Sequence, residues 1–423
     1  MEIGIGGPLL GLLSSFLNGR TITLTVNGFI SDRRPVTVGL PQGSVLSPLL
    51  FIIFIRDMLA ETEGLALQFA DDCTIIAAHK DNTALSMIHQ KNCDQVAMWM
   101  NRWRITANCA KTDLINFTSQ IQSLHINGEN INVADETKVL GVIIDSKLTF
   151  QLQRDRAKNS LQRKWNLLKP FVHAGLSAST TRKILTTVML PGAFYASHLW
   201  DIKNELKIYN VVKEMMHVPY NPPEELLLML AGITPLLIGD ISKRLSVLKQ
   251  LISNKDTICI TENTKSPLQK LFVADMVKLK GRGTEIDKLT TKDLRNSEIR
   301  KCTSKERSRK WETFLKLQSG SDGLAYHLEP NFLIKNPLPL NMDPKLLGKA
   351  CSLFSGHCNL NLHRYRLGLS FSPTCVCLQE DETVSHHLFR CPNYASLREK
   401  LDISQRSLCI QQVIQYCTST NRL

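Results

Sequence analysis

The sequence has few acidic residues relative to its basic ones. Asp and Glu number 38 against 51 Lys and Arg, which gives a formal net charge of +13 at pH 7. It also lacks an apolar run of the roughly 18–20 residues that a membrane-spanning helix needs. We therefore expect no such helix and a polyanionic partner, with nucleic acid first and an anionic membrane surface second. A mostly disordered chain is excluded, because 43% of the 423 residues are hydrophobic.

A disulfide framework is lacking as well. Most of the 12 cysteines are scattered singly, as free thiols are in a reducing compartment. Residues 3–17 are apolar, but they follow Glu2 and precede no small-residue cleavage site. Their helical spacing predicts an amphipathic core helix rather than a secretion leader. The sequence therefore predicts an intracellular protein, nuclear or cytoplasmic, that is not secreted.

The order of predicted elements gives an α+β fold in four parts. Residues 1–150 alternate strands with helices, and residues 151–240 are helical and basic. Residues 241–345 are polar, and within them we expect 260–319 to be poorly packed helices or a linker. Residues 346–423 form a tail that holds most of the cysteines.

Local signals divide residues 1–150 further. The Asn-Gly pairs at 27–28 and 127–128 predict hairpin turns. Ser47 is placed to cap a helix that has Pro48 at its first position. Hydrophobic periodicity predicts strands over 65–69, 74–78, 113–117 and 139–144, and a helix over 84–103.

Two adjacent carboxylates, Asp71 and Asp72, lie between two of these strands. A tight hairpin can present both at one edge of a sheet, where hard oxygen ligands suit Mg²⁺ or Mn²⁺. Two such ions activate a hydroxyl and stabilise a pyrophosphate leaving group. Because most Asp-Asp pairs only decorate turns, the pair alone does not decide between the two interpretations.

A glycine-containing segment precedes the carboxylates. Residues 39–51 read Gly-Leu-Pro-Gln-Gly-Ser-Val-Leu-Ser-Pro-Leu-Leu-Phe. Glycine lets the backbone approach a ligand closely, and Gln42 offers both donors and acceptors. An ordinary strand-to-helix turn is the alternative interpretation of this segment.

Together, and in this order, the two motifs resemble those of a reverse transcriptase. Residues 39–51 resemble the family's motif that contacts template and incoming nucleotide, and residues 69–72, Phe-Ala-Asp-Asp, resemble its metal-binding hairpin. Residues 108–112, Asn-Cys-Ala-Lys-Thr, resemble the next palm motif, and residues 138–145 resemble the primer-grip region. In style the four motifs are similar to those of LINE-type, jockey-like non-LTR retrotransposons.

The resemblance implies RNA-directed DNA synthesis from an RNA template, a DNA primer or target DNA, and deoxynucleotides. Asp71 would bind the catalytic Mg²⁺ or Mn²⁺ with Asp72 in support, and Lys111 would lie near the leaving pyrophosphate. For Lys111, an ordinary surface lysine is the alternative. The residues implied for the template, nucleotide and primer site are Pro41, Gln42, Gly43, Ser44 and Phe69.

One aspartate that the family uses has no counterpart. The family places its main metal ligand on a strand well before the Pro-Gln-Gly motif, whereas the acidic residues before Gly39 are Glu2 and Asp32. Met1 would fall inside the helix between those motifs, so we expect residues 1–150 to be a partial palm without fingers. The sequence therefore predicts that this chain alone does not polymerise DNA.

The stretch from 151 to 183 is strongly basic. It has one acid, Asp155, against eight cations: Arg154, Arg156, Lys158, Arg163, Lys164, Lys169, Arg182 and Lys183. With residues 191–197 and 230–236, it resembles the helical thumb of such elements. A thumb that tracks a template–primer duplex needs phosphate contacts, so we expect duplex contact here; a solvated helix face is the alternative.

The tail contains a candidate zinc site. Cys375, Cys377, His386 and Cys391 supply three thiolates and an imidazole, a set that suits tetrahedral zinc. His387 is an alternative to His386, and unliganded thiols are the alternative to zinc. The segment around them resembles the end of jockey-type proteins. A structural Zn²⁺ would fold a small knuckle-like tail that grips nucleic acid.

Two other functions compete with catalysis. The first is a non-catalytic nucleic-acid-binding remnant that keeps the charge and the zinc-binding tail. The second, a membrane-surface protein, leaves the four ordered motifs unexplained, so we expect no membrane partner. Residues 300–310 are the best candidate nuclear signal, and a solvated helix explains them equally well.

Overall fold

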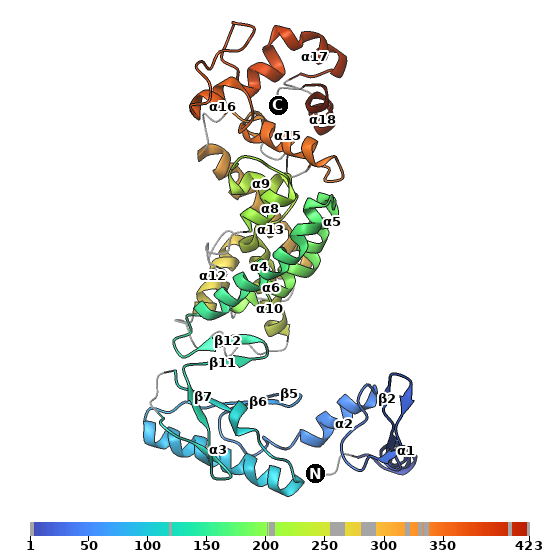
Figure 1. Ribbon diagram of the computed structural model, residues 1–423. Helices are drawn as coiled ribbons and strands as arrows, with labels where there is room; N and C mark the ends of the chain where they lie inside the picture. Colours follow the sequence, from blue (N-terminus) through green and yellow to red (C-terminus); the bar gives the residue numbers. More distant parts are fainter. Residues whose placement is uncertain are drawn as a thin grey trace. The chain divides into compact units, whose positions relative to one another are not determined.

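The computed structural model describes residues 4–117, 121–200, 202, 208–253, 267–280, 293–317, 322–328, 333, 338–404 and 408–420. The chain divides into two compact units, Met1–Leu148 and Thr149–Leu423. Figure 1 shows the strands gathered in the first part of the chain and helices through the second. This mixture of helices and strands agrees with the predicted α+β class.

In the first unit the strands pair two by two. All pairs are antiparallel except the parallel pair of β7 with β10. The elements in chain order are α1 (Gly7–Leu17), β1 (Thr21–Ile22), β2 (Thr25–Val26), β3 (Phe29–Ile30), β4 (Arg34–Pro35), α2 (Leu46–Ile55), β5 (Leu65–Phe69), β6 (Asp72–Ile76), α3 (Asn82–Trp103), η1 (Cys109–Lys111), β7 (Asp113–Ile115), β8 (His125–Ile126), β9 (Glu129–Asn130), β10 (Asn132–Ala134), β11 (Glu136–Val139) and β12 (Val142–Asp145).

Two-residue turns join several of these strands. Both Asn-Gly pairs have positive φ at both residues, as such turns require, and they connect β2 to β3 and β8 to β9. The two predicted turns are confirmed. The prediction of one strand over 139–144 is wrong, because the chain reverses at Leu140 (φ 46°) and Gly141 (φ 89°) and pairs β11 with β12.

The core of the first unit lies between α3 and the strands that follow it. Asp81 caps α3 by accepting the backbone N–H groups of Thr83 and Ala84 at 3.2 and 3.1 Å. The Gln90 side chain donates to the carbonyl of His125 at 2.9 Å and accepts its N–H at 3.0 Å, which fixes α3 against β8. The apolar side chains buried together here are those of Leu85, Ala97, Cys109, Leu114, Ile121, Leu124, Ile126 and Ile131.

Two predictions near the N-terminus are wrong. The helix α1 forms, but it buries no residue, so it is not a core helix. The strands β1 to β4 are two residues long with every residue exposed, so they do not pack with α1 into a core. Ser47 does not cap α2 either, since the helix begins at Leu46 and the Ser47 hydroxyl donates to the carbonyl of Pro41 at 2.6 Å.

The second unit is mostly helical. Its elements are α4 (Gln151–His173), α5 (Ala178–Ile184), η2 (Leu185–Met189), α6 (Leu190–Ala193), α7 (Ser197–Trp200), α8 (Tyr209–Met215), α9 (Glu224–Leu230), α10 (Leu236–Ser253), α12 (Pro267–Lys280), α13 (Asn296–Leu317), η4 (Leu324–His327), α15 (Pro344–Ser355), α16 (Asn361–Arg366), η5 (His386–Arg390), η6 (Pro392–Tyr394), α17 (Ala395–Leu401) and α18 (Ile410–Ser419). Within the described ranges, none of the helices is both long and apolar enough to cross a membrane.

The polar stretch 260–319 is better packed than predicted where the structure describes it. Helices α10, α12 and α13 share a core in which Leu245, Leu248, Phe272 and Met276 are fully buried. A buried ion pair, with Arg244 Nη2 3.2 Å from Asp275 Oδ1, joins α10 to α12. The expectation of poorly packed helices or a linker is therefore wrong for α12 and α13. The remaining parts of the stretch lie outside the described residues.

Candidate functional site

The predicted carboxylate pair lies at the end of the β5–β6 hairpin (Figure 1). Phe69 is directly opposite Asp72, so the two-residue turn consists of Ala70, with φ of 51°, and Asp71. Asp72 is thus the first residue of β6, and the returning strand begins two residues earlier than predicted. The hairpin places Asp71 at its tip and Asp72 beside it.

Both carboxylates are exposed and have no protein partner. In the part of the chain that the structure describes, neither side chain forms a hydrogen bond or ion pair. Desolvation raises the pKa of the neighbouring Cys73 thiol, and the charges of Asp72 and Asp71 raise it further. The tip is therefore a concentration of negative charge with free oxygen ligands, as a divalent cation requires.

The hairpin is held at its base and side. At Gly64, with φ of 101°, an added Cβ would lie 2.5 Å from the carbonyl oxygen of Ile76, so only glycine fits where the hairpin closes. The Gln68 amide donates to the carbonyl of Ile55 at 3.3 Å and so ties β5 to the end of α2. Local structure therefore fixes the position of the tip relative to α2.

The predicted template segment lies at the other end of α2. Pro41 and Ser44 close a turn, with Ser44 N 3.4 Å from Pro41 O, and Gln42 and Gly43 are exposed within it. Gly43 has φ of 83°, a value that favours glycine. Helix α2 thus connects this turn to the carboxylate hairpin. Among the described residues, no hydrogen bond or ion pair joins the turn directly to Asp71 or Asp72.

The remaining predicted residues lie apart or exposed. Lys111 is the last residue of η1 and is exposed, and the Phe69 side chain is 66% exposed. Asp57, which follows α2 and was not predicted as a site residue, accepts a hydrogen bond from Trp99 Nε1 at 3.0 Å. In the described ranges, neither Asp71 nor Asp72 belongs to a cluster of three or more groups able to hold a metal ion.

The eight cations of α4 and α5 differ in their surroundings. Arg154 is buried, and Lys169 forms an ion pair with Glu214 at 3.1 Å. Glu214 also accepts Trp165 Nε1 at 3.0 Å, so Lys169 is already engaged in contacts between α4 and α8. The exposed cations that could meet a polyanion are Arg156, Lys158, Arg163 and Lys183.

The four tail residues come together in the second unit. The ligand atoms of Cys375, Cys377, His386 and Cys391 all lie within 4.8 Å of one another. Cys375 Sγ is 3.8 Å from Cys391 Sγ, and Cys377 Sγ is 3.2 Å from His386 Nε2. A tetrahedral zinc site with Zn–S bonds of about 2.3 Å has S···S edges of about 3.8 Å, so the donor set fits zinc.

Two residues that the sequence did not single out lie on the side of the imidazole away from the thiols. His386 Nδ1 is buried without a hydrogen bond, 3.5 Å from a carboxylate oxygen of Glu380. Arg390 donates to Glu380 through Nε at 3.1 Å and Nη2 at 2.8 Å. These hydrogen bonds hold the pKa of Glu380 below its usual range, so the carboxylate is ionised and faces the ring nitrogen away from the thiols.

The alternative ligand His387 lies elsewhere. Its Nδ1 is 3.0 Å from the hydroxyl of Tyr416, and its ring packs 4.2 Å from that of Tyr394.

Burial raises the pKa of Cys375 to about 12. Desolvation raises the pKa of the Cys377 thiol. Hydrogen bonds from the backbone N–H of Gln379 and from the Cys375 and Cys391 thiols outweigh this effect, so the pKa of Cys377 lies below its ordinary value.

Residues 5–144 match the family model of reverse transcriptase (RNA-dependent DNA polymerase). The RNA-directed DNA polymerase from mobile element jockey of Drosophila funebris is 31% identical over 207 residues, which are 46% of this chain and 23% of that protein. The probable RNA-directed DNA polymerase from transposon X-element of Drosophila melanogaster is 28% identical over 208 residues, 46% of this chain and 23% of that protein.

A third relative matches more of the chain. The retrovirus-related Pol polyprotein from type-1 retrotransposable element R1 of Bradysia coprophila is 20% identical over 402 residues, 92% of this chain and 38% of that protein. The chain thus spans well under half the length of each of these relatives. Residues 5–144 are therefore a reverse transcriptase domain, and the matched part of the chain is similar to the RNA-directed DNA polymerases of jockey-like non-LTR retrotransposons.

Proposed function

We propose that the chain is the palm and thumb part of an RNA-directed DNA polymerase that joins deoxynucleotides to a primer by two-metal nucleotidyl transfer. The observation that carries this proposal is the β5–β6 hairpin, which holds Asp71 and Asp72 side by side without a protein partner among the described residues. It stands in a domain matched to reverse transcriptases. RNA template, DNA primer and deoxynucleotides are the substrates that follow from this assignment.

Each residue then has a role in holding the reactants. Asp71 is a ligand of Mg²⁺ or Mn²⁺, and Asp72 supports it. Bound ions would activate the attacking hydroxyl and stabilise the negative charge that develops on the leaving pyrophosphate. Lys111 adds positive charge beside the pyrophosphate. The exposed turn of Pro41, Gln42, Gly43 and Ser44 contacts template and nucleotide, and Phe69 packs against the primer end.

Two carboxylates on one hairpin cannot enclose two metal ions. No third acidic group joins them in the described ranges. We therefore expect the 423-residue chain to bind a primed template without extending it. The exposed cations of α4 and α5 would contact duplex phosphates, and each contact releases counterions, so binding would weaken as salt rises.

Two measurements on one sample test this proposal. Purified chain is titrated into a labelled DNA primer annealed to RNA, with affinity read by fluorescence anisotropy at several salt concentrations and extension read on a gel. We expect salt-dependent binding and an unextended primer. Absence of binding at low salt would overturn the polymerase assignment, and processive cDNA synthesis would overturn the expected inactivity of the isolated chain.

For the tail, we propose a structural Zn²⁺ held by Cys375, Cys377, His386 and Cys391. Thiolate and imidazole donors at tetrahedral spacing support zinc over hard cations. The bound ion would fold the segment into a knuckle that grips nucleic acid. Such a knuckle also supports a second candidate function, that of a non-catalytic nucleic-acid-binding protein. That candidate is favoured over the first if the hairpin carboxylates prove irrelevant to catalysis.

A further inference from the structure

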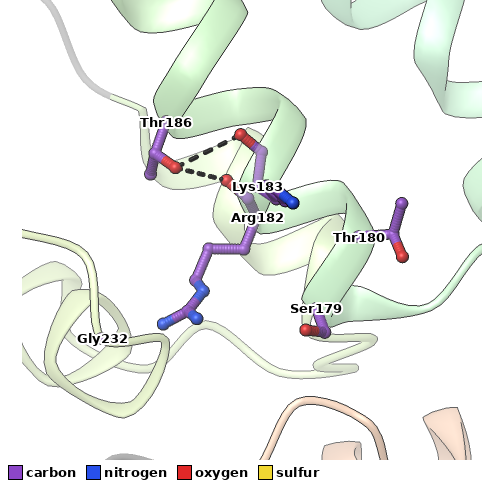
Figure 2. A pocket seen from close by; sticks show the side chains of 6 residues that line it. All are labelled: Ser179, Thr180, Arg182, Lys183, Thr186 and Gly232. Carbon is purple, nitrogen blue, oxygen red and sulfur yellow. Dashed lines mark hydrogen bonds between the residues drawn. The ribbon is translucent and has the colours of Figure 1, made fainter.

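A pocket of about 290 Å³ opens in the second unit beside α5 (Figure 2). The lining residues are Ser179, Thr180, Arg182, Lys183, Thr186 and Gly232. The lining residues carry hydroxyl groups, one guanidinium and one ammonium group, and none of them has a carboxylate or a large apolar side chain. An aqueous anion is the kind of ligand that such a lining favours.

The two walls of this pocket are fixed to each other. One wall is α5, and the other is the turn at Gly232 that follows α9. Ser179 N donates to the carbonyl of Leu340 at 3.2 Å, and Leu338 N donates to the carbonyl of Leu230 at 3.2 Å. One short segment therefore holds both walls, so the pocket is a built feature of the fold.

The cations at the pocket have no protein partner. In the part of the chain that the structure describes, the side chains of Arg182, Lys183 and Ser179 form no hydrogen bond or ion pair. Figure 2 shows the Arg182 guanidinium extended toward the Gly232 turn. Thr186 is already satisfied, since its hydroxyl donates to the carbonyls of Arg182 and Lys183 at 2.8 and 3.3 Å.

We infer that this pocket binds one phosphate group. A planar guanidinium matches two phosphate oxygens at once, and the lysine and serine side chains add a charge and a further donor. The volume is at the low end for ligand pockets, which suits a phosphate rather than a whole nucleotide. The phosphate belongs either to the backbone of a template–primer duplex or to a free polyphosphate. The inference rests on the proposed function where duplex binding is concerned.

The first arm of the test measures duplex binding. The affinity of the full chain for a labelled primed RNA is compared among wild type, Arg182→Gln and Arg182→Lys. Lys310→Gln, an exposed cation on α13 outside the pocket, is the control with the same charge change. We expect Arg182→Gln to weaken binding about tenfold and to lower the salt slope by about 1, and Arg182→Lys to recover part of the loss. We expect the control Lys310→Gln to bind the duplex with an affinity within about twofold of wild type.

The second arm identifies the source of the phosphate. Single phosphates of the duplex are replaced by neutral methylphosphonates, and inorganic pyrophosphate is titrated alone by calorimetry. A duplex position whose neutralisation weakens wild type but not Arg182→Gln supports a backbone phosphate. Pyrophosphate binding that Arg182→Gln abolishes supports a free polyphosphate, even if wild type fails to bind duplex and the proposed function falls. Folded Arg182→Gln that matches wild type in both arms would overturn the inference.

Discussion

Nε2 of His386 lies 3.2 Å from Sγ of Cys377. The two residues are separated by a loop, and the thiols of Cys375 and Cys391 are buried beside them. Four convergent soft donors in a mostly buried site are the strongest local signal of a metal ion in the described part of the chain.

The first prediction concerns zinc in the tail. Purified chain should carry one zinc ion, and Cys377→Ser should remove it because the remaining donors cannot complete a tetrahedron. Chelation should then unfold the tail, since binding and folding energies are shared. Zinc content by mass spectrometry and circular dichroism before and after chelation check this. Cys73→Ser, in the other unit, is the control, and an unchanged spectrum after chelation would count against zinc.

The second prediction concerns the carboxylate behind the imidazole. Glu380→Gln should lower zinc affinity by about 10- to 100-fold, because Glu380 orients His386 and strengthens it as a donor. Affinity is measured by competition with a chromophoric chelator. Asp381→Asn, the exposed neighbour, should bind zinc like wild type. Equal affinities for Glu380→Gln and Asp381→Asn would remove Glu380 from this role.

The third prediction tests the core of α10, α12 and α13. Phe272 is fully buried there, so Phe272→Ala should lower the free energy of unfolding by about 3–5 kcal/mol through lost burial and a cavity. Phe371 is fully exposed, and Phe371→Ala should change it by no more than about 0.5 kcal/mol. Urea unfolding followed by circular dichroism compares the two. Similar midpoints for both variants would mean that α12 does not pack as described.

The fourth prediction is a pH dependence. Desolvation raises the pKa of Asp322 to about 6, although the Val384 N–H donates to its carboxylate at 3.0 Å. A carboxyl whose pKa is higher in the folded state favours folding when protonated, so its contribution falls as pH rises from about 4 through 6. Asp322→Asn should therefore have a higher Tm than wild type at pH 7.5, with the gap closing by pH 4. A Tm difference between Asp322→Asn and wild type that stays the same from pH 4 to pH 7.5 would rule out titration of Asp322 as the cause of that difference.

Local chemistry explains which parts of the fold could be predicted. Turns at Asn27 and Asn127 depend on neighbouring residues alone, and these predictions are confirmed. The helix predicted over 84–103 begins two residues earlier, at Asn82, where the Asp81 side chain caps it. The hairpin at Leu140 was missed because it interrupts an apolar run that also suits one strand. The exposure of α1 was missed because helical periodicity indicates an apolar face but not whether another element covers it.

Long-range contacts explain the rest. Phe272 and Met276 form a narrow apolar stripe in a polar segment, and only the partners on α10 and α13 reveal it as core. Spacing alone predicted the four metal-ligand candidates and kept His387 as an alternative to His386; the structure brings His386 to the thiols and places His387 beside Tyr416. The position of Glu380 and the pocket at Arg182 depend on tertiary placement; the sequence marked Arg182 only as one of eight cations.

The central claim is that Asp71 is a metal ligand for nucleotidyl transfer. Its most direct test is the rate of single-deoxynucleotide incorporation by a chimera that joins residues 1–423 to the preceding portion of the Drosophila funebris jockey polymerase. We predict Mg²⁺-dependent incorporation that Asp71→Asn abolishes and that the exposed control Asp32→Asn preserves. An active chimera in which Asp71→Asn incorporates nucleotide as fast as its parent would contradict the account.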